Sequence, residues 1–167
     1  MAIIDVSFII PVYNRPNEIK ELLDSFSNLK GYHSYEIVII EDGSNETSES
    51  IVSAFNDQLD ISYHYKANSG PGDSRNFGMQ KAKGNYFIIL DSDVLLPPDY
   101  LTEVKKFLEK SYYECFGGPD AAHTSFTSLQ KAINFAMTSF ITTGGIRGGK
   151  QHLEDFQPRS FNMGLSK

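Results

Sequence analysis

The sequence has a single cysteine, no tryptophan and no long run of basic or apolar residues. One cysteine, Cys115, forms no intrachain disulfide and cannot supply a cluster of thiolate ligands for zinc. The absence of a basic run and the formal net charge of −6 argue against nucleic acid as the main partner. The apolar runs are far shorter than the about 20 residues of a membrane span, and no signal-peptide pattern is visible. We therefore expect a cytoplasmic protein that does not bind nucleic acid.

What the sequence does contain is a regular alternation of apolar runs and amphipathic segments. Its 167 residues suit one domain, and no internal repeat is visible. Apolar runs typical of strands in a parallel sheet lie at 6–14, 35–46, 61–65, 86–90 and 112–118. Segments with helical spacing of apolar residues lie between them at 15–29, 48–57, 70–84 and 97–110. This order predicts an α/β fold, with a mostly parallel sheet and helices on both of its faces.

The last third of the chain departs from this alternation. Apolar residues at helical spacing predict a further helix at 125–142, and a glycine-rich stretch follows it at 142–150. The apolar stripe of this helix fits three arrangements: packing in the core, burial against a segment outside the chain, or lying on a membrane surface. The sequence leaves these alternatives open.

Groups of residues that include polar and acidic side chains lie where three of the predicted strands end. They are Pro11, Val12, Tyr13 and Asn14 after the first strand, Glu41, Asp42 and Ser44 after the second, and Asp91, Ser92 and Asp93 after the fourth. Ligands of open α/β sheets bind beyond the carboxyl ends of the strands, so we expect these side chains to share one site. Each group alone also fits a turn or a helix cap. Their occurrence at one edge of the sheet favours a binding site.

The two acids after the fourth strand, Asp91 and Asp93, are the most informative pair. A carboxylate beside a core strand is costly to desolvate unless it is paired, hydrogen-bonded or bound to a cation. Two carboxylates on one turn can offer oxygen ligands to Mg²⁺ or Mn²⁺, which usually keep water and also bind substrate phosphates. Tyr13 can pack against a flat ring, and Arg75 can face a phosphate or an acid. Because no glycine-rich phosphate loop is present, the metal would hold the phosphates.

Four segments carry a resemblance to a known family. "SFIIPVYNRPNEIKELLDSF", "EIVIIEDGSNETS", "NSGPGDSRNFGM" and "YFIILDSDVLLPPDYL" occur in this order, and together they resemble the family 2 glycosyltransferases, which are nucleotide-sugar enzymes of the GT-A fold. The resemblance covers residues 5–118 most clearly, and the ending "PRSFNMGLSK" resembles the acceptor side of the same family. It implies a donor-binding region over 1–118 and the start of an acceptor-side region, in the same domain, over 119–167.

The resemblance also implies a role for each group of site residues. At the end of the site that would hold the nucleotide base, the resemblance implies that the uracil ring is bordered by Pro11, Val12 and Tyr13. It also implies that Glu41 and Ser44 lie close to Asp42. Asp42 would accept a hydrogen bond from the ring N–H of the uracil. These roles make the first two strand ends the part of the site that recognises the base.

At the phosphate end, the resemblance implies that Arg75 lies near the diphosphate or braces the aspartate turn. Asp91 would contact the ribose or the metal shell, and Asp93, beyond Ser92, would coordinate the divalent cation. Asp73 stands where the family more often has a small residue.

The implied activity is that of an inverting, metal-dependent glycosyltransferase of the hexosyltransferase type, working in glycan or polysaccharide biosynthesis. It would move a sugar from a nucleoside diphosphate sugar, expected to be a UDP-sugar, to a hydroxyl of a saccharide or lipid-linked acceptor. A lipid-linked acceptor would bring the protein to the inner face of the membrane as a peripheral contact. The catalytic base of the family is expected downstream of Asn162-Met163-Gly164 and beyond Lys167, so we interpret the chain as truncated.

Two other functions fit parts of the same pattern. A phosphatase of the haloacid dehalogenase type also places a D-x-D motif after an apolar strand, and it would use Asp91 as its nucleophile. That reading leaves Tyr13, Asp42 and Arg75 without a role. A module that binds a nucleotide without catalysis is the second alternative.

Overall fold

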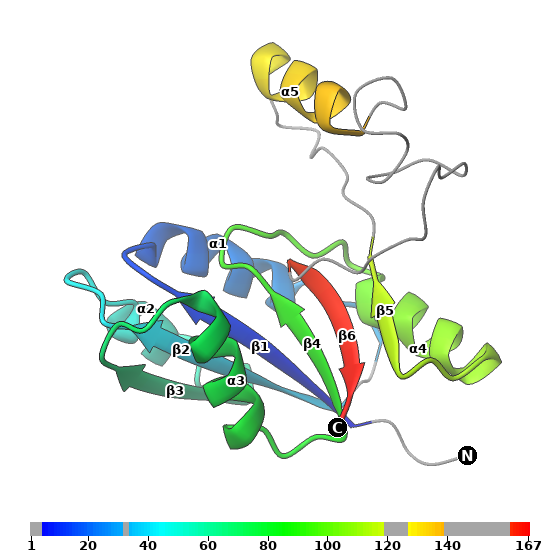
Figure 1. Cartoon of the computed structure of the whole chain (residues 1–167), viewed down its shortest axis with the longest axis horizontal. Helices are drawn as coiled ribbons and strands as arrows, with labels where there is room; N and C mark the ends of the chain where they lie inside the picture. The colour runs from blue at the N-terminus through cyan, green and yellow to red at the C-terminus, as the bar shows by residue number, and fades with distance from the viewer. Residues whose placement is uncertain (1–4, 32–33, 119–126, 139–160) are drawn as a thin grey trace.

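The computed structural model describes residues 5–31, 34–118, 127–138 and 161–167, and these build one six-stranded sheet (Figure 1). Its strands are β1 (Val6–Val12), β2 (Tyr35–Asp42), β3 (Ile61–Lys66), β4 (Tyr86–Leu90), β5 (Cys115–Gly117) and β6 (Asn162–Ser166), in the spatial order β3-β2-β1-β4-β6-β5. Strands β1 to β4 pair in parallel, whereas β6 is antiparallel to both of its neighbours. The predicted α/β fold with a mostly parallel sheet is confirmed.

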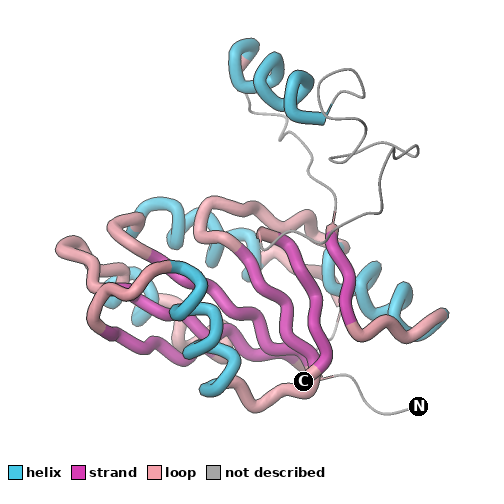
Figure 2. The backbone as a smooth tube through the Cα atoms, in the orientation of Figure 1, coloured by secondary structure: helices cyan, strands magenta, loops and turns pink. Residues whose placement is uncertain are grey.

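Helices cover both faces of the sheet, as the sequence predicts (Figures 1 and 2). They are α1 (Pro16–Ser27), α2 (Glu49–Ser53), α3 (Pro71–Lys81) and α4 (Tyr100–Lys110), followed by α5 (Ser128–Thr138) in the last third. The larger core lies between the sheet and helices α1, α2 and α4, while a smaller core lies between the sheet and α3. Both faces of the central strands are therefore buried, which is why these strands read as continuous apolar runs.

The start of α1 follows directly from the sequence. Pro16 occupies the first helical position, where its missing N–H has no intrahelical partner to lose. The apolar face of α1 then buries Ile19, Leu22 and Phe26, and the Phe26 ring meets the Phe8 ring edge-on at a centroid distance of 4.8 Å. This packing fixes α1, and with it the loop that leads from β1 into the helix.

Strand β6 is missed by the sequence analysis, which predicts no strand after residue 118. It enters between β4 and β5, where Met163 pairs with Ile89 and Gly164 pairs with Ile88. The Phe116 ring lies over Gly164, so that a Cβ atom there would come within 2.0 Å of the ring. The five residues of β6 are thus a strand because of their neighbours in space rather than because of an alternating pattern of their own.

Helix α5 is the described part of the helix that we predict at 125–142; residues 125, 126 and 139–142 lie outside the described residues. Leu129 and Ile133, which belong to its apolar stripe, are 71% and 51% exposed. Core packing, the first of the three alternatives for the stripe, is therefore wrong for these two residues. Among the helices of the described part of the chain, none has the length and apolar character to cross a membrane.

Helix α3 lies close to the sheet because Gly78 faces it. A Cβ atom on Gly78 would come within 2.5 Å of Ile40 and 2.6 Å of Ile9, whereas one on Gly72 in the same helix would meet no atom within 4 Å. We expect Gly78→Ala to lower the free energy of unfolding by about 1 to 3 kcal/mol through overpacking. Gly72→Ala should leave it unchanged or raise it by up to about 1 kcal/mol. Urea denaturation of both variants checks this, and equal effects would contradict the close packing of α3.

Candidate functional site

The loops after β1 and β2 are joined to each other at the carboxyl edge of the sheet. The backbone N–H of Asn14 donates to Ser44 Oγ at 2.7 Å, and Asn14 Oδ1 accepts from the backbone N–H groups of Asn45 and Glu46 at 2.8 and 3.2 Å. Asn14 has a φ of 53°, in the left-handed region that asparagine tolerates better than most residues. These bonds fix the backbone on which Tyr13 is carried.

The structure separates the three residues that were predicted to border a base. The Tyr13 ring is 50% exposed at the end of β1 and can meet a ligand. Val12, by contrast, is 2% exposed, and its side chain packs in the larger core. Pro11, the residue before Val12 in β1, is partly buried.

Glu41 is fully buried and is held by donors of the protein itself. Its carboxylate accepts from Ser44 Oγ, from the backbone N–H and Oγ of Ser48 at 2.8 and 2.9 Å, and from the Tyr63 hydroxyl at 3.0 Å. Burial, together with the Glu41 charge, raises the pKa of Tyr63 and so keeps this hydroxyl protonated as a donor. The buried hydrogen bonds of Glu41 with Ser44 and Ser48 therefore hold the loop after β2 in its conformation.

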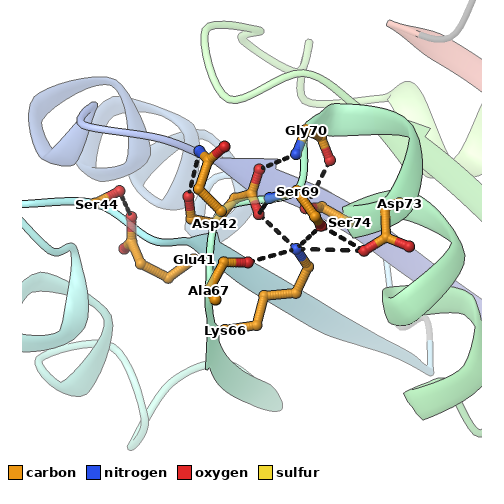
Figure 3. A network of polar contacts seen from close by, with 10 residues as sticks. Glu41, Asp42, Ser44, Lys66, Ala67, Ser69, Gly70, Asp73 and Ser74 are labelled. Carbon is orange, nitrogen blue, oxygen red and sulfur yellow. Dashed lines mark hydrogen bonds and ion pairs between the residues drawn. The ribbon is translucent and has the colours of Figure 1, made fainter.

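Asp42, the last residue of β2, is the centre of a second network (Figure 3). It is 3% exposed; its Oδ1 accepts from Lys66 Nζ at 2.5 Å and from the Ser69 N–H at 3.0 Å, and its Oδ2 accepts from the Gly70 N–H at 2.9 Å. Burial alone would raise the pKa of Asp42, but the hydrogen bonds from Lys66, Ser69 and Gly70 outweigh it and lower that pKa. Asp42 thus ties the end of β3 to the start of α3.

Lys66 and Ser69 are members of this network that the sequence analysis missed. Lys66 Nζ also donates to Ser69 Oγ and to the Ala67 carbonyl, and it lies 3.4 Å from Asp73 Oδ2. Ser69 Oγ donates to Asp73 at 2.5 Å. The unusual acid at position 73 is therefore a second, more exposed partner for Lys66. Lys66 is the last residue of β3. Because ligands of open α/β sheets bind beyond the carboxyl ends of the strands, its position could have identified Lys66 as a candidate site residue.

Gly43 lets the loop after β2 pass close to this network. It has a φ of 73°, and a Cβ atom on it would lie 2.6 Å from the backbone nitrogen of Asn68. The Asn68 side chain in turn donates to the Asp42 carbonyl at 2.8 Å. Both the backbone conformation and the contact require glycine here.

Asp91 and Asp93 follow β4 on a turn, and each is paired with an arginine. Arg75 Nη2, from α3, lies 2.8 Å from Asp91 Oδ1, and Arg15 Nη1, from the residue before α1, lies 3.1 Å from Asp93 Oδ2. The Asp91 N–H donates to the Phe161 carbonyl at 3.3 Å, so the segment leading into β6 also holds the turn. Ser92 is 7% exposed and packs inward.

The carboxylates of Asp91 and Asp93 each keep one oxygen that accepts no hydrogen bond from the described residues. Their side chains are 39% and 56% exposed. Within the described ranges, no group of three or more His, Cys, Asp or Glu side chains is placed to hold a metal ion. A cation at this turn would therefore have the carboxylates of Asp91 and Asp93 as its two protein ligands. Mg²⁺ and Mn²⁺ are commonly bound by one or two carboxylates plus water and substrate phosphates, and the pair fits such an ion.

The connections of the sheet place these groups at its switch point. From β1 the chain moves outward through β2 and β3, and it then returns to form β4 on the other side of β1. The Arg15–Asp93 contact joins the loop after β1 to the turn after β4 across this point. A crevice at the carboxyl ends of such strands is the usual ligand position in open α/β sheets.

Comparison with known proteins identifies the class to which this fold and site belong. The structure of S. aureus TarS in complex with UDP-GlcNAc superimposes with a TM-score of 0.67 at 25% identity, covering 74% of this chain and 36% of that one. The mannosyltransferase PcManGT from Pyrobaculum calidifontis, in complex with GDP-Man and Mn²⁺, gives a TM-score of 0.63 at 23% identity, covering 70% and 35%. The fold is thus the GT-A glycosyltransferase fold.

The sequence gives the family directly. Residues 7–163 match Glycosyl transferase family 2, and the chain belongs to this family. An uncharacterized glycosyltransferase of Rickettsia bellii is 36% identical over 126 residues, which are 75% of this chain and 17% of that protein. Chondroitin synthase of Escherichia coli is 32% identical over 151 residues, 86% of this chain and 22% of that protein.

The chain spans about a fifth of the length of these two relatives. Its membership of the family confirms the resemblance carried by the four segments. It also decides against the phosphatase alternative, in which Asp91 would be a nucleophile.

Proposed function

We propose that this chain is the donor-binding part of an inverting glycosyltransferase that takes its sugar from a UDP-sugar and needs a divalent cation. One observation carries the proposal: Asp91 and Asp93 lie together at the switch point of the sheet, and each has a carboxylate oxygen to offer a cation. Support comes from TarS, which was solved with UDP-GlcNAc, and from PcManGT, which was solved with GDP-Man and Mn²⁺.

At the phosphate end, Asp93 and Asp91 would hold Mg²⁺ or Mn²⁺. The bound cation would neutralise the charge that develops on the leaving diphosphate. Arg75 keeps Asp91 in place through its 2.8 Å contact, and its own Nε is buried without a hydrogen-bond partner among the described residues. The acceptor is a hydroxyl of a saccharide or of a lipid-linked sugar.

At the base end, the exposed Tyr13 ring would pack on the uracil. Asp42 is proposed to accept the uracil N–H. To do so, it must share or give up one of its hydrogen bonds to Lys66, Ser69 or Gly70. Base recognition would therefore be coupled to the position of the first turn of α3.

Calorimetric titration of UDP, GDP and ADP in the presence of Mn²⁺ tests this function. We expect UDP to bind about tenfold more tightly than either purine nucleotide, a difference of about 1.4 kcal/mol. A folded protein that binds none of the three would contradict the donor site. Equal affinities would contradict its preference for uracil.

A further inference from the structure

Each carboxylate of the aspartate turn has its own arginine, and the family resemblance accounts for only one of them. The resemblance implies that Arg75 lies near the diphosphate or braces the aspartate turn, and Arg75 pairs with Asp91 at 2.8 Å. Nothing in the sequence singles out Arg15, which pairs with Asp93 at 3.1 Å. We propose that Arg15 binds the diphosphate of the donor, and that it opposes a free cation at Asp93 while favouring a cation that arrives with a nucleoside diphosphate. This inference rests on the proposed function.

The position of Arg15 is fixed by its neighbours in the chain. It follows Asn14, whose backbone and side chain are hydrogen-bonded to the loop after β2. The Arg15 carbonyl accepts the N–H of Ile19 at 3.2 Å in the first turn of α1. The guanidinium therefore extends from a rigid base toward Asp93, and it brings a positive charge to the proposed cation site.

The contact itself is open and can be exchanged. The side chains of Arg15 and Asp93 are 48% and 56% exposed, and ion pairs that are so exposed contribute little to stability. Glu18 offers Arg15 a second acid at 4.0 Å, also at the surface. Arg15 can thus leave Asp93 Oδ2 without leaving a buried charge behind.

The charges then decide which ligand the site prefers. A divalent cation bound at Asp93 lies close to the Arg15 guanidinium, and the two positive charges repel each other. A diphosphate reverses this balance because its oxygens attract both groups. An arginine has five N–H donors in a planar fork that matches phosphate oxygens, and Asp93 engages only one of its terminal nitrogens here. The cation and the Arg15 guanidinium would both bind the diphosphate.

The test measures two affinities in the whole chain: that of Mn²⁺ alone, by electron paramagnetic resonance, and that of UDP in saturating Mn²⁺, by calorimetry. In Arg15→Ala we expect Mn²⁺ alone to bind about threefold more tightly, because the repelling charge is gone. We expect UDP to bind about tenfold more weakly, because a phosphate contact is lost. A role confined to structure would not move the two affinities in opposite directions.

Three further variants test whether the charge of Arg15 causes the two changes in affinity. Arg15→Gln, which is also neutral, should behave like Arg15→Ala, while Arg15→Lys should keep the Mn²⁺ affinity of the wild type because the charge remains. Glu18→Gln, the matched control, should leave both affinities within about twofold because it keeps Arg15 at Asp93. Circular dichroism checks that each variant is folded.

The opposite outcomes separate this inference from the proposed function. If both affinities fall in Arg15→Ala, or if neither changes, Arg15 does not act on the diphosphate and only this inference is overturned. If wild-type protein with Mn²⁺ does not bind UDP at all, the proposed function fails and the inference fails with it.

Discussion

Replacing Asp42 by alanine is expected to lower the free energy of unfolding by about 2 to 3 kcal/mol. The reason is that Asp42 is 3% exposed and accepts three hydrogen bonds, one from an ammonium group and two from backbone N–H groups. Without it, the Lys66 ammonium and the N–H groups of Ser69 and Gly70 lose a buried acceptor. Chemical denaturation monitored by circular dichroism measures the loss.

Asp73→Ala is the matched control for Asp42→Ala. Asp73 contacts the same two partners, Lys66 and Ser69, but its side chain is 62% exposed. In the control, Lys66 keeps its 2.5 Å contact with Asp42, so we expect only a small change in stability. Equal losses in the two variants would contradict the view that Asp42 organises this end of the sheet.

A second large effect is expected at the opposite end of the sheet, at Glu36. This residue is 7% exposed, and its Oε1 accepts from Ser7 Oγ at 2.6 Å and from the backbone N–H groups of Lys83 and Gly84 at 2.5 and 3.2 Å. Glu36 therefore anchors the connection from α3 to β4. We expect Glu36→Ala to lower the free energy of unfolding by about 2 to 3 kcal/mol at pH 7, because the Ser7 hydroxyl and the Lys83 N–H lose their acceptor, whereas the Gly84 N–H keeps Ser7 Oγ at 2.9 Å.

The loss at Glu36 should depend on pH. Burial alone would raise the pKa of Glu36, but the hydrogen bonds from Ser7, Lys83 and Gly84 lower it below its ordinary value. A carboxyl group whose pKa is lowered by folding stabilises the protein above its unfolded-state pKa, about 4.3, and loses this contribution as the pH falls through the folded-state value. The difference between wild type and Glu36→Ala should therefore shrink as the pH is lowered from about 6 to about 3.

Lys83→Ala serves as the control for Glu36. The Lys83 side chain is 81% exposed and its Nζ lies 3.9 Å from Glu36, whereas its backbone N–H, which makes the 2.5 Å bond, remains in the variant. We expect little change in stability. A difference between wild type and Glu36→Ala that is constant with pH would show that the charge of Glu36 is not what stabilises this connection.

Periodicity predicted most of the fold because the central strands and α1 are shaped by burial that shows in the sequence. Strand β1 and the start of α1 at Pro16 lie where the apolar runs and the proline place them. Helix α2 is shorter than the predicted 48–57, since it ends at Ser53. Strand β6 could not be predicted from the sequence because it forms through pairing with β4 and β5, which are distant from it in the chain.

The site was predicted in outline but not in its internal contacts. The rule that parallel strands present their carboxyl ends together predicted a shared edge for Tyr13, Asp42 and Asp93. It did not predict that Glu41 is enclosed by its own loop or that Lys66 holds Asp42, because such partners are chosen by tertiary packing. Val12 was assigned to the site from its position in the motif, and the pleat of β1 turns it into the core.

Asp93 is proposed to hold a cation that in turn holds the nucleotide. The most direct test is calorimetric titration of UDP into wild-type protein and Asp93→Ala, each with and without Mn²⁺. We expect Mn²⁺ to strengthen UDP binding to the wild type and to have no such effect on the variant. Asp93→Ala should stay folded because that side chain is 56% exposed. A folded Asp93→Ala protein in which Mn²⁺ strengthens UDP binding as much as in the wild type would contradict this role of Asp93.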